Sequence, residues 1–299
     1  MRLIADIRKK SETVAGLVAC LMLLIILGAG TLSAQSVNWE GQTGIFVTPL
    51  AYTAASPKNN IGKPILSYHF LNAGEVLGNF HTASVTVGMA SRVEFGYTRA
   101  FHQSGETPAL SPLWDKGFNI VHGKVNLIPE NAGEHRWPPA ITVGFVARTQ
   151  VHNVSGVLAD KDYNNNDFYV VATKTVTQTK KVPLVLNAGF RATNGSVYGV
   201  TGTAPAYKGR LFGAAAFVVK GPAKSTIVLG AEIAQQPRDI KNLPGVILPT
   251  TLVYAVRIVP SAKAKLNIDC GIAQVAGKIL PGVDVKVRQQ FGFGISYAF

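Results

Sequence analysis

Most of the chain after residue 62 consists of twelve stretches in which apolar side chains alternate with polar or small ones. Each has 9–13 residues, close to the roughly 9–11 that a tilted β-strand needs to cross a bilayer. Alternation with period two gives a strand two different faces. We therefore predict an all-β fold, a transmembrane antiparallel up-and-down β-barrel, rather than a soluble β-sandwich. The predicted strands are 63–72, 80–88, 92–101, 117–128, 139–151, 167–177, 182–192, 208–219, 225–236, 250–259, 263–275 and 288–299.

The connections between these stretches alternate in length. Short turns fall near 89–91, 178–181, 220–224 and 260–262, and long loops at 102–116, 152–166, 193–207, 237–249 and 276–287. This asymmetry is typical of Gram-negative outer-membrane barrels, whose short turns face the periplasm. An even strand number then puts both termini in the periplasm. The connection at 129–138 is the weakest part of the pattern, so ten or fourteen strands stay open as alternatives.

Residues 1–34 have the features of a secretory signal peptide. A basic stretch with Arg2, Arg8, Lys9 and Lys10 precedes an apolar run of 14 residues, 14–27, and small residues follow it. An uncleaved helical anchor would need about 20 apolar residues. We therefore expect cleavage after Ala34 and export to the outer membrane.

Residues 35–62 do not alternate like the strands. They are rich in Gly and polar residues, and prolines recur at Pro49 and Pro57. We expect a plug-like segment, at the periplasmic mouth or inside the lumen, followed by the barrel at 63–299.

The chain is basic, with a formal charge of +13. Removing residues 1–34 takes away four bases and two acids and leaves +11. Export and the scattered positions of the bases argue against nucleic acid as a partner, and leave an anionic lipid surface or a basic channel lining. Cys270 would be the one cysteine of the mature chain, which excludes an intramolecular disulfide.

The last strand shows the alternation most clearly. Its large side chains are predicted to face lipid and its small ones the lumen. Because the chain ends on an aromatic residue, we also expect this strand to be the signal read by the outer-membrane barrel assembly machinery. The large residues are Phe291, Phe293, Ile295, Tyr297 and Phe299.

Basic residues dominate the positions assigned to the lumen. Fixed positive charge in a pore wall favours anions, but interior bases can also pair with acids, as Arg92 with Glu94 or Lys265 with Asp269. Both interpretations stay open; Glu232 is a third interior acid. The predicted lumen-lining bases are Arg92, Lys124, Arg148, Arg191, Arg257 and Lys265.

No catalytic or cofactor motif stands out. His69, His81, His122 and His152 are accompanied by many serines, but no local pattern joins them into a nucleophilic site. No phosphate-binding glycine loop is present. We therefore expect no enzyme, no cofactor and no metal site.

Four segments resemble a family of Gram-negative envelope proteins known as a domain of unknown function, DUF3034. They are the opening 39–49, then 92–97, 167–174 and 186–193. The resemblance implies an exported barrel and carries no established activity. The Gly and Thr-Pro opening is also similar to YjbH-like exopolysaccharide-associated barrels.

The sequence thus favours a porin-like channel for small, anionic solutes, embedded among outer-membrane lipids and lipopolysaccharide. The alternative is a non-conducting envelope protein that supports polysaccharide export or outer-membrane structure. An open basic lumen would favour the channel, and a filled interior would favour the alternative.

Overall fold

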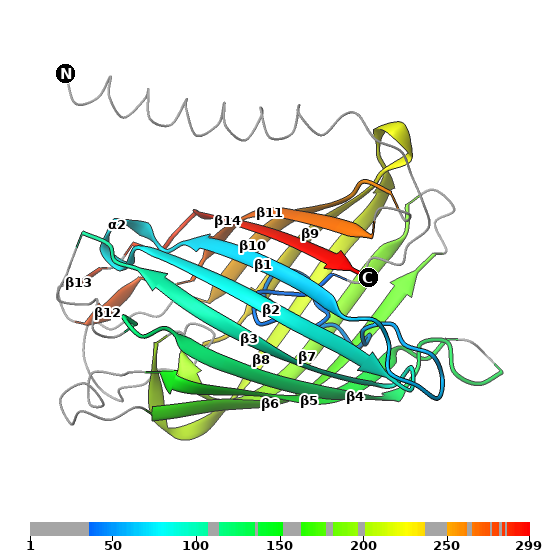
Figure 1. The fold of residues 1–299 in the computed structure, drawn as a ribbon, viewed down its shortest axis with the longest axis horizontal. Coiled ribbons are helices and arrows are strands. Elements are labelled where there is room, and N and C mark those ends of the chain that lie inside the picture. The colour runs from blue at the N-terminus through cyan, green and yellow to red at the C-terminus, as the bar shows by residue number, and fades with distance from the viewer. Residues whose placement is uncertain are drawn as a thin grey trace.

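The computed structural model describes residues 36–106, 114–134, 137–151, 163–177, 182–196, 201–236, 250–261, 265–275, 277–280, 283–284 and 286–299. Within them, twelve antiparallel strands close into one barrel in the order β1-β14-β11-β10-β9-β8-β7-β6-β5-β4-β3-β2 (Figure 1). These strands are β1 (Ile65–Asn72), β2 (Asn79–Met89), β3 (Val93–Gln103), β4 (Phe118–Ile128), β5 (Ala140–Val151), β6 (Tyr163–Val176), β7 (Leu184–Ser196), β8 (Thr201–Lys220), β9 (Thr226–Ala234), β10 (Thr251–Val259), β11 (Leu266–Gln274) and β14 (Gln290–Ala298).

The predicted fold class and strand number are confirmed, because each strand overlaps one predicted stretch. The clearest difference is that β6, β7 and β8 extend further into the predicted loops 152–166 and 193–207. Pairing between β7 and β8 continues past Thr193 through register shifts. Apolar alternation is expected only in the part of a strand that faces lipid. It therefore does not reveal these extensions.

Three small elements lie in the connections. Helix α2 (Gly74–Leu77) joins β1 to β2, and a 3-10 turn (Pro222–Lys224) joins β8 to β9. A separate hairpin of β12 (Lys278–Leu280) and β13 (Val283–Asp284) lies between β11 and β14. In the described residues, no helix has the length and apolar character needed to cross a membrane.

The two ends of the barrel differ. One end, here called the short-turn end, carries the β2–β3 and β8–β9 turns and the C-terminus, at the right of Figure 1. The other, the long-loop end, carries α2 and the β12–β13 hairpin, at the left. The predicted turn at 178–181 lies outside the described residues. That the short-turn end faces the periplasm stays a prediction.

The outer face of the barrel is apolar all the way round. Every wall strand exposes at least one large apolar side chain, and in water such a continuous apolar surface would be unfavourable. A closed barrel with an apolar exterior satisfies its backbone hydrogen bonds within a bilayer, so the chain is an outer-membrane β-barrel. Examples, one for each strand in chain order, are Leu66, Val85, Phe95, Val121, Phe145, Phe168, Phe190, Leu211, Leu229, Tyr254, Ile272 and Ile295.

The final strand β14 closes the barrel between β11 and β1. Its small residues Gly292, Gly294 and Ser296 are buried inward, whereas Ile295 and Tyr297 are exposed on the outer face. The side chain of Phe299 is also exposed, and its ring packs edge-on against Tyr297 with centroids 5.0 Å apart.

We predict that replacing Tyr297 and Phe299 together with serine will impair assembly, because both aromatic rings are removed from the closing strand. The measurement is the fraction of protein whose mobility on an unboiled gel differs from that of the boiled protein. Replacing Tyr207, an exposed aromatic residue on β8, with serine is the matched control. An unchanged folded fraction in the double variant would show that the terminal aromatics are not an assembly signal.

Candidate functional site in the barrel interior

Residues 36–54, here called the N-terminal segment, lie inside the barrel (blue in Figure 1). Residues 36–48 are all buried, whereas 57–61 are exposed at the short-turn end. The segment folds on itself: Asn38 Oδ1 accepts hydrogen bonds from the backbone N–H groups of Glu40 and Gln42, both at 3.0 Å. Gly41 has φ +88°, which favours glycine. A Cβ there would also lie 2.5 Å from Thr98 Oγ1.

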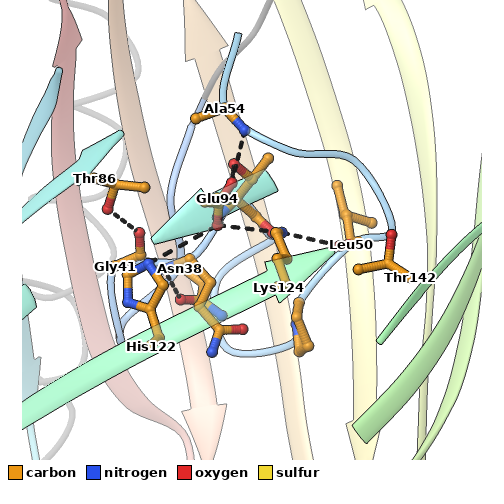
Figure 2. Close-up of polar contacts among 12 residues, drawn as sticks. Asn38, Gly41, Leu50, Ala54, Thr86, Glu94, His122, Lys124 and Thr142 are labelled. Carbon is orange, nitrogen blue, oxygen red and sulfur yellow. Dashed lines mark hydrogen bonds and ion pairs between the residues drawn. The ribbon is translucent and has the colours of Figure 1, made fainter. Parts of the chain in front are cut away.

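A buried ion pair on β3 and β4 holds one side of the segment (Figure 2). Glu94 accepts hydrogen bonds from the backbone N–H of Thr43 at 2.9 Å and of Ala54 at 2.7 Å, and from the Thr43 hydroxyl. Lys124 Nζ lies 3.3 Å from Glu94 Oε1 and donates to the carbonyls of Thr43 and Leu50. Buried backbone groups need such partners, and here the wall supplies them.

Threonine hydroxyls on the same side bind further carbonyls of the segment. Thr98 donates to the carbonyl of Glu40 at 2.8 Å, and Thr86 donates to that of Gly41 at 2.5 Å (Figure 2). Inward-facing residues of β2 and β3 therefore supply hydrogen-bond donors to carbonyls of the segment that its internal backbone hydrogen bonds leave over.

The opposite wall binds the segment through one carboxylate. Glu232 on β9 accepts hydrogen bonds from the backbone N–H of Phe46 at 2.7 Å, Val47 at 3.2 Å and Thr48 at 2.6 Å. Thr48 also donates its hydroxyl to Glu232 at 2.6 Å. Four donors of the segment converge on the two oxygens of this carboxylate, so Glu232 anchors residues 46–48.

Three further ion pairs join the segment to β5, β6 and β7. Arg148 on β5 contacts Glu40 of the segment at 2.5 Å and Asp167 on β6 at 2.9 Å. Arg191 on β7 lies 3.5 Å from Asp167. These four residues, here called the Arg148 cluster, tie the segment to three neighbouring strands.

On β10, Arg257 pairs with Asp269 at 2.7 Å. Its other guanidinium nitrogens donate to the carbonyls of Gly44 at 3.0 Å and Ile45 at 2.9 Å. All of its hydrogen-bonding nitrogens are therefore used by the barrel wall and the segment.

The long-loop end is closed by apolar and aromatic packing. Trp114, in the connection between β3 and β4, packs edge-on against Phe80 with ring centroids 5.4 Å apart and tilted against His102 at 5.2 Å. Leu77 of α2 and Trp39 of the segment are buried in the same cluster. A cavity of about 30 Å³ lies beneath them, about the volume that a single water molecule occupies in the liquid.

The short-turn half contains a larger cavity, of about 360 Å³. It lies between the N-terminal segment and the inner faces of β6 to β11. Arg257 and Asp269 border it, and Glu130, in the β4–β5 turn, places it at the short-turn end. Its apolar lining consists of Ile45, Phe46, Leu50, Val185, Ala216, Val218, Val228 and Ala255.

The six predicted lumen-lining bases divide into two groups. Four are buried in the interior and all are in ion pairs: Lys124, Arg148, Arg191 and Arg257. Arg92 lies outside the strands, in the β2–β3 turn, where it is exposed and donates to the carbonyls of Asn126 and Leu127. Lys265 is likewise exposed, just before β11. Neither belongs to the interior, because the strands begin one residue after each of them.

The interior pairs cross between strands rather than running along one strand. Glu94 pairs with Lys124, its direct register partner on β4, and Asp269 with Arg257, its partner on β10. The expected pairing of Glu94 with Arg92 and of Asp269 with Lys265 is therefore wrong. Directly opposed residues on neighbouring strands have Cβ atoms about 4.5–5.5 Å apart, closer than residues two apart on one strand.

Sequence reasoning missed Glu40 and Asp167 as interior acids. Period two around the exposed Phe168 and Val170 would have placed Asp167 inward. Nothing local signals that Glu40 meets Arg148, because this contact joins positions 108 residues apart.

Of the histidines singled out in the sequence, two lie in the barrel interior and one lies on the outer face. His69 is buried, with Nε2 3.1 Å from the carbonyl oxygen of Val37 in the segment. His122 is buried 3.9 Å from Glu94, and His81 lies on the outer face, 2.6 Å from the Tyr68 hydroxyl. His152 lies outside the described residues. Among the residues that the structure describes, no three His, Cys, Asp or Glu side chains are grouped so as to hold a metal ion.

Several solved barrels are similar to this chain at low identity. The KdgM porin has 10% identity and a TM-score of 0.44, over 79% of this chain and 99% of that one. The NanC porin has 7% and 0.45, over 79% and 98%. LpxR from Salmonella typhimurium has 8% and 0.44, over 79% and 100%. The barrel assignment rests on the strand pairing itself.

A comparison with curated protein sequences gives no match. The resemblance to YjbH-like barrels stays a prediction. The family model described as a protein of unknown function, DUF3034, matches residues 34–246. Because the match covers well over half of its length, the chain belongs to the DUF3034 family.

Proposed function

We propose that this protein is an envelope protein whose barrel does not conduct in its resting state, because its own N-terminal segment closes the lumen. One observation carries the proposal: two wall carboxylates, Glu94 and Glu232, are committed to backbone N–H groups of the segment. A segment that left the lumen easily would not need two buried carboxylates bound to its backbone. The proposed setting is the outer membrane, among its lipids and lipopolysaccharide, with both termini in the periplasm.

The balance of buried charge supports this interpretation over an anion channel. Among the described residues, five buried acids accompany four buried bases, so the buried charge around the segment has no positive excess. The bases are Lys124, Arg148, Arg191 and Arg257, and the acids are Glu40, Glu94, Asp167, Glu232 and Asp269.

We also propose that the barrel has no catalytic role. The buried histidines contact the N-terminal segment or lie beside its ion pairs, which accounts for their burial without chemistry.

Planar-bilayer recordings of the purified, folded barrel test the proposal. We expect no steady current from the intact protein. Deleting residues 36–54 will produce a steady current, because it removes the material that fills the lumen. The control deletes residues 278–284, the β12–β13 hairpin outside the barrel, and stays closed. A steady current through the intact protein would contradict the proposal.

A gated channel is the second candidate, favoured by the cavity beside the segment. If the segment leaves the lumen, four acids and four bases remain among the buried wall residues, since Glu40 leaves with it. We predict that the deletion variant will show little preference between chloride and potassium. In that background, replacing Arg148, Arg191 and Arg257 together with glutamine will shift the reversal potential toward cations. A strong anion preference before the replacement would restore the anion-channel interpretation.

A further inference from the structure

The cavity at the short-turn end is not explained by closure of the barrel. Elsewhere, inward-facing threonine, glutamate and lysine side chains bind the N-terminal segment directly. On β8, β9 and β10 the corresponding inward positions include Ala216, Val228 and Ala255, which offer no hydrogen bond. Here the wall and the segment stand apart and leave about 360 Å³ between them.

The size and walls of the cavity fit a small molecule. Its volume lies in the range of roughly 300–1,000 Å³ that is usual for ligand sites. At roughly 30 Å³ for each water-sized group, it has room for about a dozen non-hydrogen atoms. Its lining is mainly apolar, and burying apolar surface of a guest against it is favourable.

The polar groups at the two ends of the cavity already have partners. Arg257 and Asp269 neutralise each other, and Arg257 uses its remaining donors on the segment. At the other end, the Tyr52 hydroxyl lies 2.9 Å from both Glu130 Oε2 and Thr175 Oγ1. A charged ligand would bring an unpaired charge into this space, which is costly. A hydroxyl on a ligand could still share the Tyr52 and Thr175 oxygens.

We propose that this cavity binds an uncharged, largely apolar molecule of about a dozen non-hydrogen atoms, with at most a hydroxyl placed near Tyr52. The site goes beyond closure of the lumen and does not depend on whether the barrel conducts. Binding is therefore measured without recording a current. A failure of the ligand to bind and a failure of the segment to close the lumen are separate results.

The test uses the folded full-length mature protein in lipid nanodiscs and ¹⁹F NMR. The probe is 4-(trifluoromethyl)benzyl alcohol, which is uncharged and of the right size, with 4-(trifluoromethyl)benzoate as its charged counterpart. We expect a saturable bound signal for the alcohol, one per barrel, and at least tenfold weaker binding of the benzoate.

Two variants fill the cavity. Gly230→Leu places its Cβ 3.5 Å from the Cβ of Ala216 and 3.6 Å from Cγ2 of Ile45, which are ordinary contacts. Ala216→Phe fills the same space from β8. Ala188→Phe, on the exposed face of β7, is the matched control. Gel mobility without boiling shows which proteins are folded.

We expect both cavity variants to weaken binding of the alcohol at least tenfold, and the control to bind like the unaltered protein. The proposal is overturned if the folded cavity variants bind the alcohol unchanged. It is also overturned if the alcohol enters only the lipid, without saturation, or if the benzoate binds more tightly.

Discussion

Replacing Arg148 with alanine will lower the free energy of unfolding by about 3–5 kcal/mol. Arg148 is fully buried between Glu40 of the N-terminal segment and Asp167 of β6. Its loss leaves two carboxylates close together in the interior, and Arg191, 3.5 Å from Asp167, is the one base left to balance them. Breaking a buried pair costs far more than the pair contributes in net terms, because the remaining charge is uncompensated.

Denaturant titration of the refolded barrel, followed by gel mobility, measures this loss. Lys174→Ala is the matched control: Lys174 lies 3.9 Å from Glu130, and both side chains are partly exposed, so its loss costs no more than about 1 kcal/mol. Combining Arg148→Met with Glu40→Gln leaves Asp167 paired with Arg191, removes the uncompensated charge and should recover much of the stability. A loss for Arg148→Ala as small as that of the control would show that the Arg148 cluster does not hold the segment.

Replacing Glu232 with alanine will release the middle of the N-terminal segment and produce transient openings in bilayer recordings. The change removes the acceptor used by the N–H groups of Phe46, Val47 and Thr48. A single buried donor without a partner costs about 1–3 kcal/mol. The population of the displaced segment will therefore rise tenfold or more, since about 1.4 kcal/mol corresponds to a factor of ten.

Glu232→Gln should open less often than Glu232→Ala, because the amide oxygen still accepts hydrogen bonds. The control is Asp284→Ala in the β12–β13 hairpin, where the carboxylate pairs with the partly exposed Arg288. The anchoring role of this carboxylate would be ruled out if the Glu232→Ala barrel folded normally and opened no more often than the unaltered protein.

The sequence predicts the wall of this barrel better than its contents. Lipid-facing residues must be apolar, so alternation identified all twelve strands and placed Arg148, Arg191 and Arg257 inward. Alternation gives a direction but no partner. The contact of Arg148 with Glu40 depends on how the N-terminal segment folds inside the lumen, which no local pattern reports.

Strand β8 is a second example of what alternation does not predict. Its stretch 208–219 is among the twelve predicted strands, but its residues 211–219 are apolar or small on both faces, so the sequence does not assign their register. The structure directs Ala216 and Val218 inward and exposes Leu211 and Phe217. Ala216 and Val218 line the cavity, together with Ile45 and Phe46 of the segment. The position where the alternation fails is therefore the position of the proposed ligand site.

Amide hydrogen exchange of the N-terminal segment, measured by mass spectrometry on the folded barrel, tests most directly whether the segment closes the lumen. We predict that peptides covering 36–54 will exchange as slowly as those of β3, because their N–H groups are buried and bound to Glu94 and Glu232. Residues 57–61, which are exposed, should exchange rapidly in the same sample. Exchange of 36–54 within seconds, at the rate of 57–61, would contradict the account.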